Sequence, residues 1–455
     1  MTSKAKFTTG STMRHVVVMT LSGSLGLSFM FLVDFLALYW VSRLQNEALI
    51  AAIGFAATLQ FFVISISIGM MIGAVALVSR TLGMGRPRRA RRIATSALLY
   101  GVGAQLVIAV LVHSFRYPLL RLSGAEGEVL EVAAQFLKIS LPSLPLIAAG
   151  MMAGAVLRSL GDALRSMLVT ALAGLVAVVL DPLFILWMGW GVDGAAAVIV
   201  ISRGVMAVVG LYWLIQTHNM LTRPAWVDLK LYLPAFAAIA VPAIATQLST
   251  PFGNWILIRA TAEHGASAVA GMGVVSRLTI LSFGGIFALS GAIGGIIGQN
   301  AGAGLKDRVL QAYKDSLLFC AVYTGVTWLM LALCADLVTQ AFGLTGEAAE
   351  VVRVFSLYAA GSFVFTGALF VSNAAFNNLG RPVWATVANW SRDGVLMGPL
   401  AFAMGGMFGI AGVVMAQALA NTLVGIGAAY AAWRYVKHGR GIEPRPGRTR
   451  GRPAA

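Results

Sequence analysis

Charged residues are scarce in this chain. They make up 11% of its 455 residues, whereas hydrophobic residues make up 58%, and the mean hydropathy is +0.83. An ordinary soluble domain carries roughly 25% charged residues. Such a shortage over this length excludes an ordinary soluble fold, and the long apolar runs indicate helices that cross a membrane.

Cysteines are few, and the motifs of common enzymes are missing. The two cysteines, Cys320 and Cys334, lie in one apolar run, which favours buried hydrophobic side chains over a disulfide or a metal pair. The sequence contains no G-x-x-x-x-G-K-[ST] phosphate loop and no H-E-x-x-H zinc motif. We therefore expect a protein that is not an enzyme, with no metal site, no bound cofactor and no ATP-hydrolysing domain in this chain.

The net charge of +16 would suggest nucleic-acid binding in a soluble protein. Here the basic residues stand between apolar runs, as at Arg86–Arg92, Lys306–Arg308 and the Arg-rich tail from Arg434. Acidic residues such as Glu126 and Glu347 occupy the intervening loops. Because cytoplasmic loops of membrane proteins are enriched in Lys and Arg, this alternation predicts that both termini are cytoplasmic and that nucleic acid is not a partner.

Twelve apolar runs are long enough to cross a bilayer, which takes about 20 helical residues. The runs cover residues 16–41, 47–78, 92–113, 131–156, 166–188, 192–214, 234–262, 268–298, 311–341, 347–375, 382–405 and 408–436. The sequence therefore predicts an all-α membrane protein of twelve transmembrane helices.

The chain also repeats itself at a nearly constant spacing. The matched segments are Ser79–Gly85 with Gly298–Gly304, Arg158–Gly161 with Asn377–Gly380, and Gly54 with Gly273, all at an offset of 219, and Gly191–Gly194 with Gly409–Gly412 at an offset of 218. The same register pairs Gly23 with Pro242. One match would mean little, since glycines are common, but several in one register indicate a duplicated unit.

The first half holds six helices, an even number, so the two halves share one orientation in the membrane. Parallel repeats of this kind enclose a substrate path between two lobes; a duplicated scaffold without transport is the alternative. We expect a cytoplasmic N-terminus at 1–15, an N-lobe at 16–215, a cytoplasmic linker at 216–233, a C-lobe at 234–436 and a basic, disordered cytoplasmic tail at 437–455.

Six segments in order make the chain resemble the multidrug and toxic compound extrusion (MATE) family of antiporters, from about residue 14 to residue 436. They are Leu32–Asp34, Leu157–Asp162, Leu180–Ile185, Gly298–Gly304, Asn378–Pro382 and Gly409–Gly412. The resemblance implies a V-shaped bundle of two six-helix lobes and cation-coupled export of organic compounds. It is greatest to the DinF-like branch, whose coupling carboxylates lie on helices 1 and 5 of the N-lobe.

Asp34 and Asp181 are the carboxylates at those positions. Carboxylates inside a membrane are costly and usually functional. At 1.5 Å per residue, Asp34 lies about 27 Å and Asp181 about 22 Å along their helices from the cytoplasmic end, so both reach a similar depth. Two carboxylates in a low-dielectric site oppose each other's ionisation, which lets one bind and release a proton near neutral pH. We expect Asp34 to bind the coupling cation and Asp181 to support it; a structural role for each, with Asp181 serving the helix distortion at Pro182, is the alternative.

The proton is favoured over sodium as the coupling ion. In the family that the chain resembles, sodium-site members carry an Asn four residues before the helix 5 aspartate and a Thr on helix 6. The matching residues of this chain are Ala177 and Ile199, which supply no side-chain oxygen. The helix 4 stretch Gly150–Gly154 also lacks amide side chains. Another departure is at Met19–Gly23, which lacks the proline usual early in helix 1, so bending driven by that proline cannot be carried over.

Further polar residues in the second half are candidates for binding substrate in a cavity. They are Gln247, Asn254, Asn373, Asn377 and Arg392. Hydrogen bonding between helices is the alternative for the amides. A buried arginine should pair or line water, so Arg392 either pairs with Asp393 or takes part in transport.

These features predict a secondary active transporter, a cation-coupled (proton) antiporter that exports organic, often cationic or amphiphilic, compounds. We expect small organic substrates and membrane lipid as partners, a monomer, and a multi-pass location in a bacterial inner membrane. A lipid or lipid-linked oligosaccharide flippase is the alternative, although such proteins usually carry more charge in the central groove. A sodium-coupled antiporter is the other.

Overall fold

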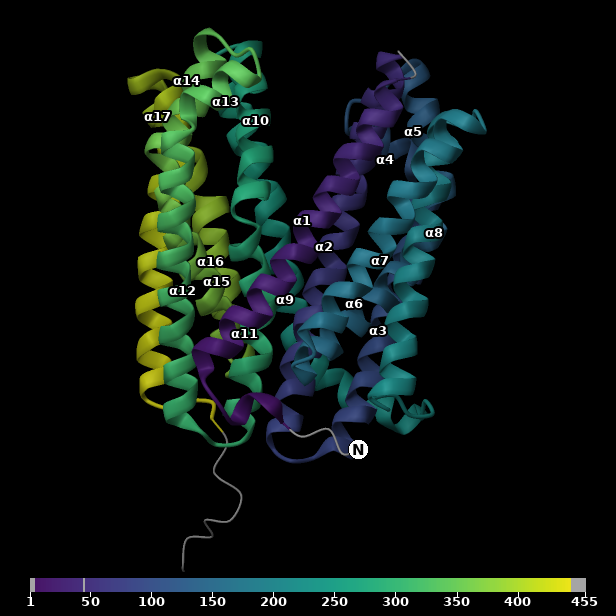
Figure 1. Cartoon of the computed structure of the whole chain (residues 1–455), viewed down its shortest axis with the longest axis vertical. Coiled ribbons are helices and arrows are strands. Elements are labelled where there is room, and N and C mark those ends of the chain that lie inside the picture. The colour runs from purple at the N-terminus through teal and green to yellow at the C-terminus, as the bar shows by residue number, and fades with distance from the viewer. Residues whose placement is uncertain (1–4, 44–45, 443–455) are drawn as a thin grey trace, which may run out of the picture. The chain divides into compact units, whose positions relative to one another are not determined.

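The computed structural model describes residues 5–43 and 46–442, apart from the side chains of Asp34, Leu38, Ser42 and Glu47. Helices and short connections make up this part of the chain, and it contains no strand (Figure 1). The all-α fold class is therefore confirmed. Most of the expected tail at 437–455 and the first residues of the expected N-terminal segment lie outside the described residues.

The elements of the first half are η1 (Lys6–Thr8), α1 (Thr12–Ser42), α2 (Glu47–Gly83), α3 (Pro87–Ser114), α4 (Arg116–Leu122), α5 (Gly127–Ser140), η2 (Leu141–Ser143), α6 (Leu144–Leu160), α7 (Ala163–Pro182), η3 (Leu183–Trp187), α8 (Gly191–Tyr212) and η4 (Trp213–Thr217). Those of the second half are α9 (Trp226–Ala262), α10 (Ala266–Ser282), α11 (Gly284–Gly302), α12 (Lys306–Leu333), α13 (Ala335–Ala341), α14 (Gly346–Leu357), η5 (Ala359–Ser362), α15 (Phe363–Asn378), α16 (Pro382–Trp390), η6 (Ser391–Leu396) and α17 (Met397–Lys437). The segments η3, η4 and η6 are π-helical.

The described residues contain ten helical stretches that are long and apolar enough to cross a membrane, and the bent pair α10 and α11 adds an eleventh. One stretch, Pro382–Lys437, has 56 residues. At 1.5 Å per residue it would extend about 84 Å, far more than a hydrocarbon core of about 30 Å. It is interrupted at Gly409, where φ is 61° and ψ is −151°. Two crossings joined at Gly409 fit this length, so the structure is consistent with twelve spans and the chain is a multi-pass membrane protein.

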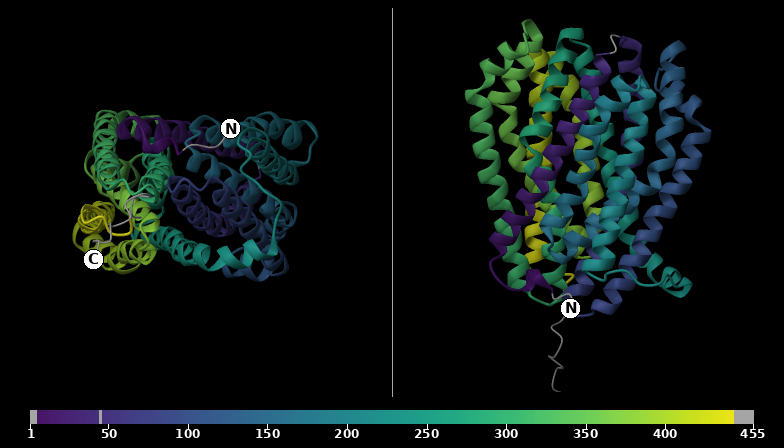
Figure 2. Two further views of the ribbon diagram at one scale, coloured as in Figure 1. Left: turned by 90° about the horizontal axis from the view of Figure 1, so that it is seen from below. Right: turned by 45° about the vertical axis from the view of Figure 1, so that its right-hand side comes forward.

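Contacts divide the described chain into two compact units. Unit 1 contains Leu25–Val78 and Pro87–Ala240, and unit 2 contains Lys4–Ser24, Ser79–Arg86 and the chain from Val241 onward. Figure 2 shows the long helices of each unit packed lengthwise against one another. The sequence limits given above for the lobes remain predictions.

Small residues let the helices of unit 1 approach closely. A Cβ atom at Gly150 of α6 would lie 2.5 Å from Cγ of Met206 on α8, and one at Gly210 of α8 would lie 2.7 Å from Cβ of Ala153. Small side chains at such crossings allow the dense van der Waals packing that associates helices in membranes. These contacts place α6 and α8 side by side.

The turn between α6 and α7 shows what the Leu157–Asp162 segment does. Gly161 ends α6 with φ at 79°, a left-handed conformation that glycine adopts readily. Asp162 then caps α7 by accepting a hydrogen bond from the backbone N–H of Arg165, and its carboxylate also contacts the Arg165 guanidinium at 2.7 Å and His218 Nε2 at 2.8 Å. Burial raises the pKa of Asp162, but the hydrogen bonds from His218 and Arg165 outweigh burial, so the pKa lies below its ordinary value.

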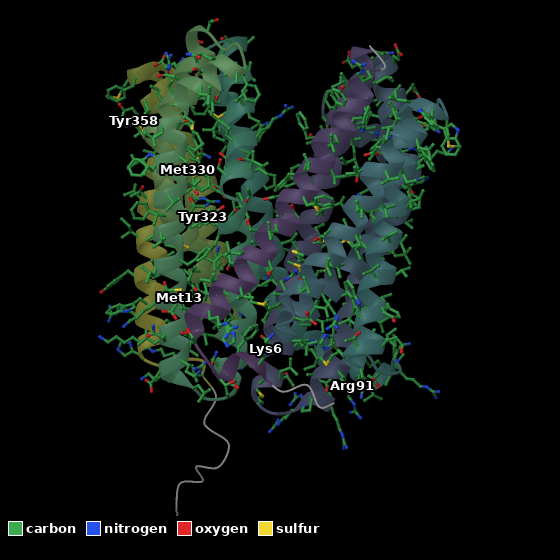
Figure 3. All side chains as sticks on the ribbon, viewed as in Figure 1. Lys6, Met13, Arg91, Tyr323, Met330 and Tyr358 are labelled. Carbon is green, nitrogen blue, oxygen red and sulfur yellow. The ribbon has the colours of Figure 1, made fainter. Side chains whose placement is uncertain are left out.

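In unit 1 a second group of contacts fixes the chain before α9. Arg91 of α3, labelled in Figure 3, donates from Nη2 to Asn219 Oδ1 at 2.7 Å and to the Leu221 carbonyl at 2.9 Å. Asn219 has a positive φ of 47°, a conformation that asparagine tolerates better than most residues. Arg91, one of the basic residues between two apolar runs, therefore also holds the connection between η4 and α9 in place.

In unit 2 the largely buried helix α15 packs against α11, α12 and α17. Tyr313 of α12 is fully buried and donates from its hydroxyl to the carbonyl oxygen of Ala429 on α17 at 3.0 Å. On the same helix, Tyr323 (labelled in Figure 3) donates to the carbonyl oxygen of Ser282 at 2.9 Å. Cys320 is buried, as the apolar run predicts, whereas Cys334 is half-buried.

The two copies of the repeated glycine motif contact each other reciprocally. A Cβ at Gly83 would lie 2.0 Å from the carbonyl oxygen of Gln299, and a Cβ at Gly302 would lie 2.0 Å from the carbonyl oxygen of Arg80. The offset of 219 converts Gly83 into Gly302 and Arg80 into Gln299. Each motif therefore makes the same contact to the other, as the two surfaces of a twofold interface do.

The two copies differ in the chain end that they hold. Gln299 accepts a hydrogen bond from the backbone N–H of Phe7 at 2.8 Å, and Arg308 donates to the Phe7 carbonyl oxygen at 2.9 Å. At the equivalent position of the first copy, Arg80 donates to the carbonyl oxygen of Gly441 at 3.2 Å. Gln299 thus holds the N-terminal segment, and the equivalent Arg80 holds the chain just after α17.

Replacing Gly302 with alanine tests the reciprocal glycine contact. The added methyl group would meet a backbone carbonyl, which cannot move without displacing its helix, so we expect Gly302→Ala to lower the thermal unfolding temperature in detergent by several degrees. Gly325→Ala on α12 is the matched control, since a Cβ there meets no atom within 4 Å. The control should be neutral or slightly stabilising, because alanine favours helix. Equal stability of both variants would contradict the close contact.

Candidate functional site

Asp34 and Asp181 belong to neighbouring helices of unit 1. Asp34 lies in α1, and its side chain is outside the described residues. The residue before it, Val33, is buried, and its Cγ2 atom would lie 3.1 Å from a Cβ atom at Gly174 of α7. Asp181 lies two turns later on α7, directly before its last residue, Pro182, and only 3% of it is exposed. The crossing of α1 and α7 thus brings the backbone of the two aspartate positions into one region.

An apolar cluster fills this region. It consists of Val33, Ala177 and Val198, with Phe29, Val178, Leu180 and Phe184 packed against them. Ala177 lies one turn before Asp181 on α7, so it shares the face that carries the carboxylate. Ala177 and Val198 offer no oxygen to a metal ion from their side chains. The described residues also contain no group of three or more His, Cys, Asp or Glu side chains that could hold a metal.

The helix geometry changes directly after Asp181. Pro182 lacks a backbone N–H, and the chain continues as the π-helical segment η3. A proline inside a helix removes a hydrogen bond, and π-helical turns are frequent at functional sites. Asp181 therefore stands where the helical ladder is interrupted, which agrees with the distortion that the sequence suggests.

Unit 1 also contains a buried arginine among neutral partners. Arg203 of α8 is 7% exposed and donates from Nη1 to the Ser140 carbonyl oxygen at 3.1 Å and to Ser143 Oγ at 2.9 Å. Its Nη2 donates to Gln60 Oε1 on α2. None of these partners is a carboxylate, so the positive charge is solvated by dipoles. In the sequence, Arg203 is detectable as an arginine inside the apolar run at 192–214. Its hydrogen-bond partners could not be predicted, because they come from distant segments.

The amide candidates of the second half differ in burial. Asn373 and Asn377 lie one turn apart on α15 and are buried, whereas Asn254 on α9 is exposed and Gln247 is half-buried. Within the described part of the chain, the Oδ1 atoms of Asn373 and Asn377 accept no hydrogen bond. The two asparagines therefore present acceptors that a ligand or a water molecule can use.

Arg392 is paired with its sequence neighbour. Its Nε and Nη2 atoms donate to the two carboxylate oxygens of Asp393 at 2.7 and 2.9 Å, and both side chains are buried in η6. Ser249 of α9 donates to the same carboxylate at 2.9 Å. Of the two interpretations of Arg392, pairing with Asp393 is the one that the geometry of unit 2 displays.

Comparison with known proteins gives the fold and the family. A sequence model of the MatE family matches residues 24–183 and 242–403, once in each repeat. A FAD transporter of Shewanella oneidensis is 30% identical over 402 residues, which cover 87% of this chain and 89% of that protein. The multidrug export protein MepA of Staphylococcus aureus is 23% identical over 402 residues, covering 86% and 87%.

Solved structures agree with this result. A mutant of the Vibrio cholerae MATE transporter VcmN superposes with a TM-score of 0.90 at 22% identity, covering 95% of this chain and 98% of that one. An outward-facing multidrug resistance MATE family transporter of the MOP superfamily gives 0.89 at 21% identity, covering 96% and 98%. At these identities the likeness concerns the fold, and it is the family match in both repeats that classifies the sequence. The chain belongs to the MatE family, whose members are transporters and not enzymes.

Proposed function

We propose that this transporter is a proton-coupled antiporter that exports organic, often cationic or amphiphilic, compounds from a bacterial cell across the inner membrane, with both termini in the cytoplasm. The observation that carries the proposal is the crossing of α1 and α7, where the Asp34 position lies next to a helix that ends in the buried carboxylate Asp181. A carboxylate at this depth is stable only if it is protonated, paired or hydrated. Exchange between such states is what couples a proton to transport.

The apolar cluster supports the proton over sodium. A sodium ion needs several oxygen ligands, and the positions that supply an amide and a hydroxyl in sodium-site members are Ala177 and Ile199 here. Ala177 packs among apolar side chains. A proton needs only one carboxylate oxygen and a path for water, so it makes no demand on these positions.

Each step of the proposed cycle is a competition for one carboxylate. Asp34 binds a proton from the outer side, where the proton concentration is higher, and becomes neutral. Neutralisation removes the charge that a cationic substrate needs, so the substrate leaves to the outside. Loss of the proton to the cytoplasm restores the charge for the next substrate. Asp181 opposes full ionisation of the pair and so favours uptake of the proton.

A flavin nucleotide is a second candidate substrate. The 30% identical relative is named a FAD transporter, and unit 1 keeps the Arg203 cation among neutral partners. A buried positive charge without a carboxylate produces a positive potential, which attracts a pyrophosphate and repels an organic cation.

Asparagine at position 34 should abolish transport. It keeps the size and polarity of the side chain but cannot gain or lose a proton. We expect Asp34→Asn to insert and fold normally and to reduce efflux of a fluorescent organic cation to background, and Asp181→Asn to reduce it about tenfold. Asp193→Asn is the control, since Asp193 is an exposed residue in the first turn of α8. Full efflux by Asp34→Asn would contradict the assignment of Asp34 as the coupling carboxylate.

Separately imposed gradients distinguish the coupling ions. In proteoliposomes that contain the purified transporter, a proton gradient directed into the vesicle should drive substrate out of it without sodium. A sodium gradient at equal pH on both sides should drive no export. The substrate is tetraphenylphosphonium, and Asp34→Asn vesicles measure the leak. Export driven by sodium alone would replace the proton with sodium in the cycle.

The same vesicles decide between the two substrate classes. If Arg203 directs substrate choice, FAD should move under the pH gradient, and Arg203→Met should reduce FAD movement at least tenfold while tetraphenylphosphonium changes less than twofold. No FAD movement by the unaltered protein would exclude the flavin candidate and leave the cation exporter.

A further inference from the structure

A row of polar contacts joins α9 to α16 and to the following segment η6 in unit 2. The contacts are Thr386 Oγ1 to the Pro242 carbonyl oxygen at 2.8 Å, Trp390 Nε1 to the Ala245 carbonyl oxygen at 2.9 Å, and Ser249 Oγ to Asp393 Oδ2 at 2.9 Å. The numbers rise together along both segments, so the helices run in the same direction. The row ends at Asp393, its only charged member.

The ion pair at the end of this row is unusual for adjacent residues. Successive side chains of an α-helix are rotated by about 100° and do not face each other. Arg392 and Asp393 nevertheless pair through two hydrogen bonds of 2.7 and 2.9 Å. They lie in the π-helical segment η6, whose wider turn changes that rotation. The ion pair thus forms between two residues of the π-helical turn.

A glycine on α9 makes room for this turn. A Cβ atom at Gly253 would lie 2.9 Å from Cβ of Asp393 and 3.0 Å from its Oδ1. Any larger residue at position 253 would displace the carboxylate. Together with the hydroxyl of Ser249, one turn earlier, Gly253 seats Asp393 directly against α9.

The internal repeat relates this contact to the crossing of α1 and α7. The offset of 219 pairs Gly253 with Asp34, and Asp393 with Gly174. In unit 1, Gly174 packs against Val33, the residue before Asp34. Each repeat therefore has one aspartate and one glycine at equivalent positions of these two helices. The first repeat has the aspartate on its first helix, and the second repeat has it on the partner helix.

The counter-charge of Asp393 is supplied by Arg392. Among the described residues, α16 and α17 pack against η6, and Ser249 links it to α9. Within these, Pro382–Trp390 and Met397–Trp433 contain no charged residue, and the first charged residue of α9 after Ser249 is Arg259, about 15 Å further along the helix. A positive charge that neutralises Asp393 would therefore leave Arg392 without its carboxylate.

We propose that Asp393 is a second cation-responsive carboxylate, placed by the repeat at the position equivalent to the crossing at Asp34. This proposal rests on the proposed function, because it adds a site to the same cation-coupled cycle. A proton or a positively charged substrate that binds Asp393 releases Arg392. The π-helical turn then loses the pair that maintains it and relaxes toward α-helical register, which rotates the residues that follow it against α9.

A spin-label measurement tests this rotation without any gradient. With Cys320 and Cys334 replaced by alanine, nitroxide labels are attached to Val395→Cys, within η6, or to Val383→Cys, before the π-helical turn. Both valines are more than half exposed. The oxygen accessibility of each label is measured in lipid nanodiscs between pH 8 and pH 5, and at pH 8 with added tetraphenylphosphonium.

We expect the accessibility at position 395 to change at least twofold in one of these titrations and that at position 383 to stay constant. A change with pH alone identifies the proton as the ligand, and a change only with tetraphenylphosphonium identifies the substrate. No change at position 395 in either titration overturns the proposal. Since no transport is measured, failure of Asp34 as the coupling site would leave this readout intact.

Replacing Arg392 and Asp393 with neutral residues distinguishes a role in transport from a purely structural role. A buried ion pair that is only structural can be replaced by apolar residues of similar size without loss of stability. We expect Arg392→Met with Asp393→Leu to insert and to unfold at the wild-type temperature, but to export at no more than a tenth of the wild-type rate. The control replaces the exposed pair of Arg353 and Asp336, 2.8 Å apart, by the same residues and should keep at least half the rate.

Wild-type export by the neutral pair would show that Arg392 and Asp393 only support the fold. If the neutral pair fails to insert, Asp393→Asn with the label at position 395 replaces it. Asparagine removes the charge and keeps the hydrogen bond from Ser249, so the label should report the released state at every pH. A label that still responds to pH in Asp393→Asn would also contradict the proposal.

Discussion

The cost of a charge inside a membrane is the constraint on which the rest of this structure depends. An ionised side chain in the apolar interior must be paired, hydrogen-bonded, hydrated or protonated. The chain meets this requirement differently at each place. Arg203 is surrounded by neutral oxygen acceptors, Arg392 and Asp393 neutralise each other, and Asp181 is buried next to a proline-interrupted turn. The carboxylates are the members of this set that a proton can neutralise.

Close glycine contacts decide where these charges lie. Gly174 lets α1 approach α7 near Asp34, and Gly253 lets α9 approach Asp393. Gly83 and Gly302 likewise allow a close backbone contact between the ends of α2 and α11. Because these contacts recur at the repeat offset, the duplication preserves helix crossings more faithfully than it preserves the polar side chains placed on them.

Much of the fold could be predicted from the sequence, because span length and hydrophobicity are local properties. The apolar runs, the repeat register and the family segments led to twelve parallel-repeat helices, with which the structure is consistent, and to the family. The spans near 131–156 and 268–298 contain breaks, at Leu141–Ser143 and Phe283, that a hydropathy pattern does not resolve. The π-helical turn at Ser391–Leu396, which contains the Arg392–Asp393 pair, was not predicted either.

The candidate site was less predictable, because it depends on contacts between distant segments. The sequence singles out Asp34, Asp181 and Arg392 as charges in apolar runs, and their roles remain proposals. It could not place the amides: Asn254 is exposed, while Asn373 and Asn377 are buried. Nor could it show that Ser249 and Gly253, four residues apart on α9, converge on Asp393.

Proton release on substrate binding tests the central claim most directly. Purified transporter in a weakly buffered detergent solution near pH 7 is mixed with tetraphenylphosphonium, and a pH indicator records the protons that appear. If substrate and proton compete for intramembrane carboxylates, binding must release close to one proton per substrate molecule, and sodium must not change the amount. Binding that releases no proton and is instead displaced by sodium would contradict the account.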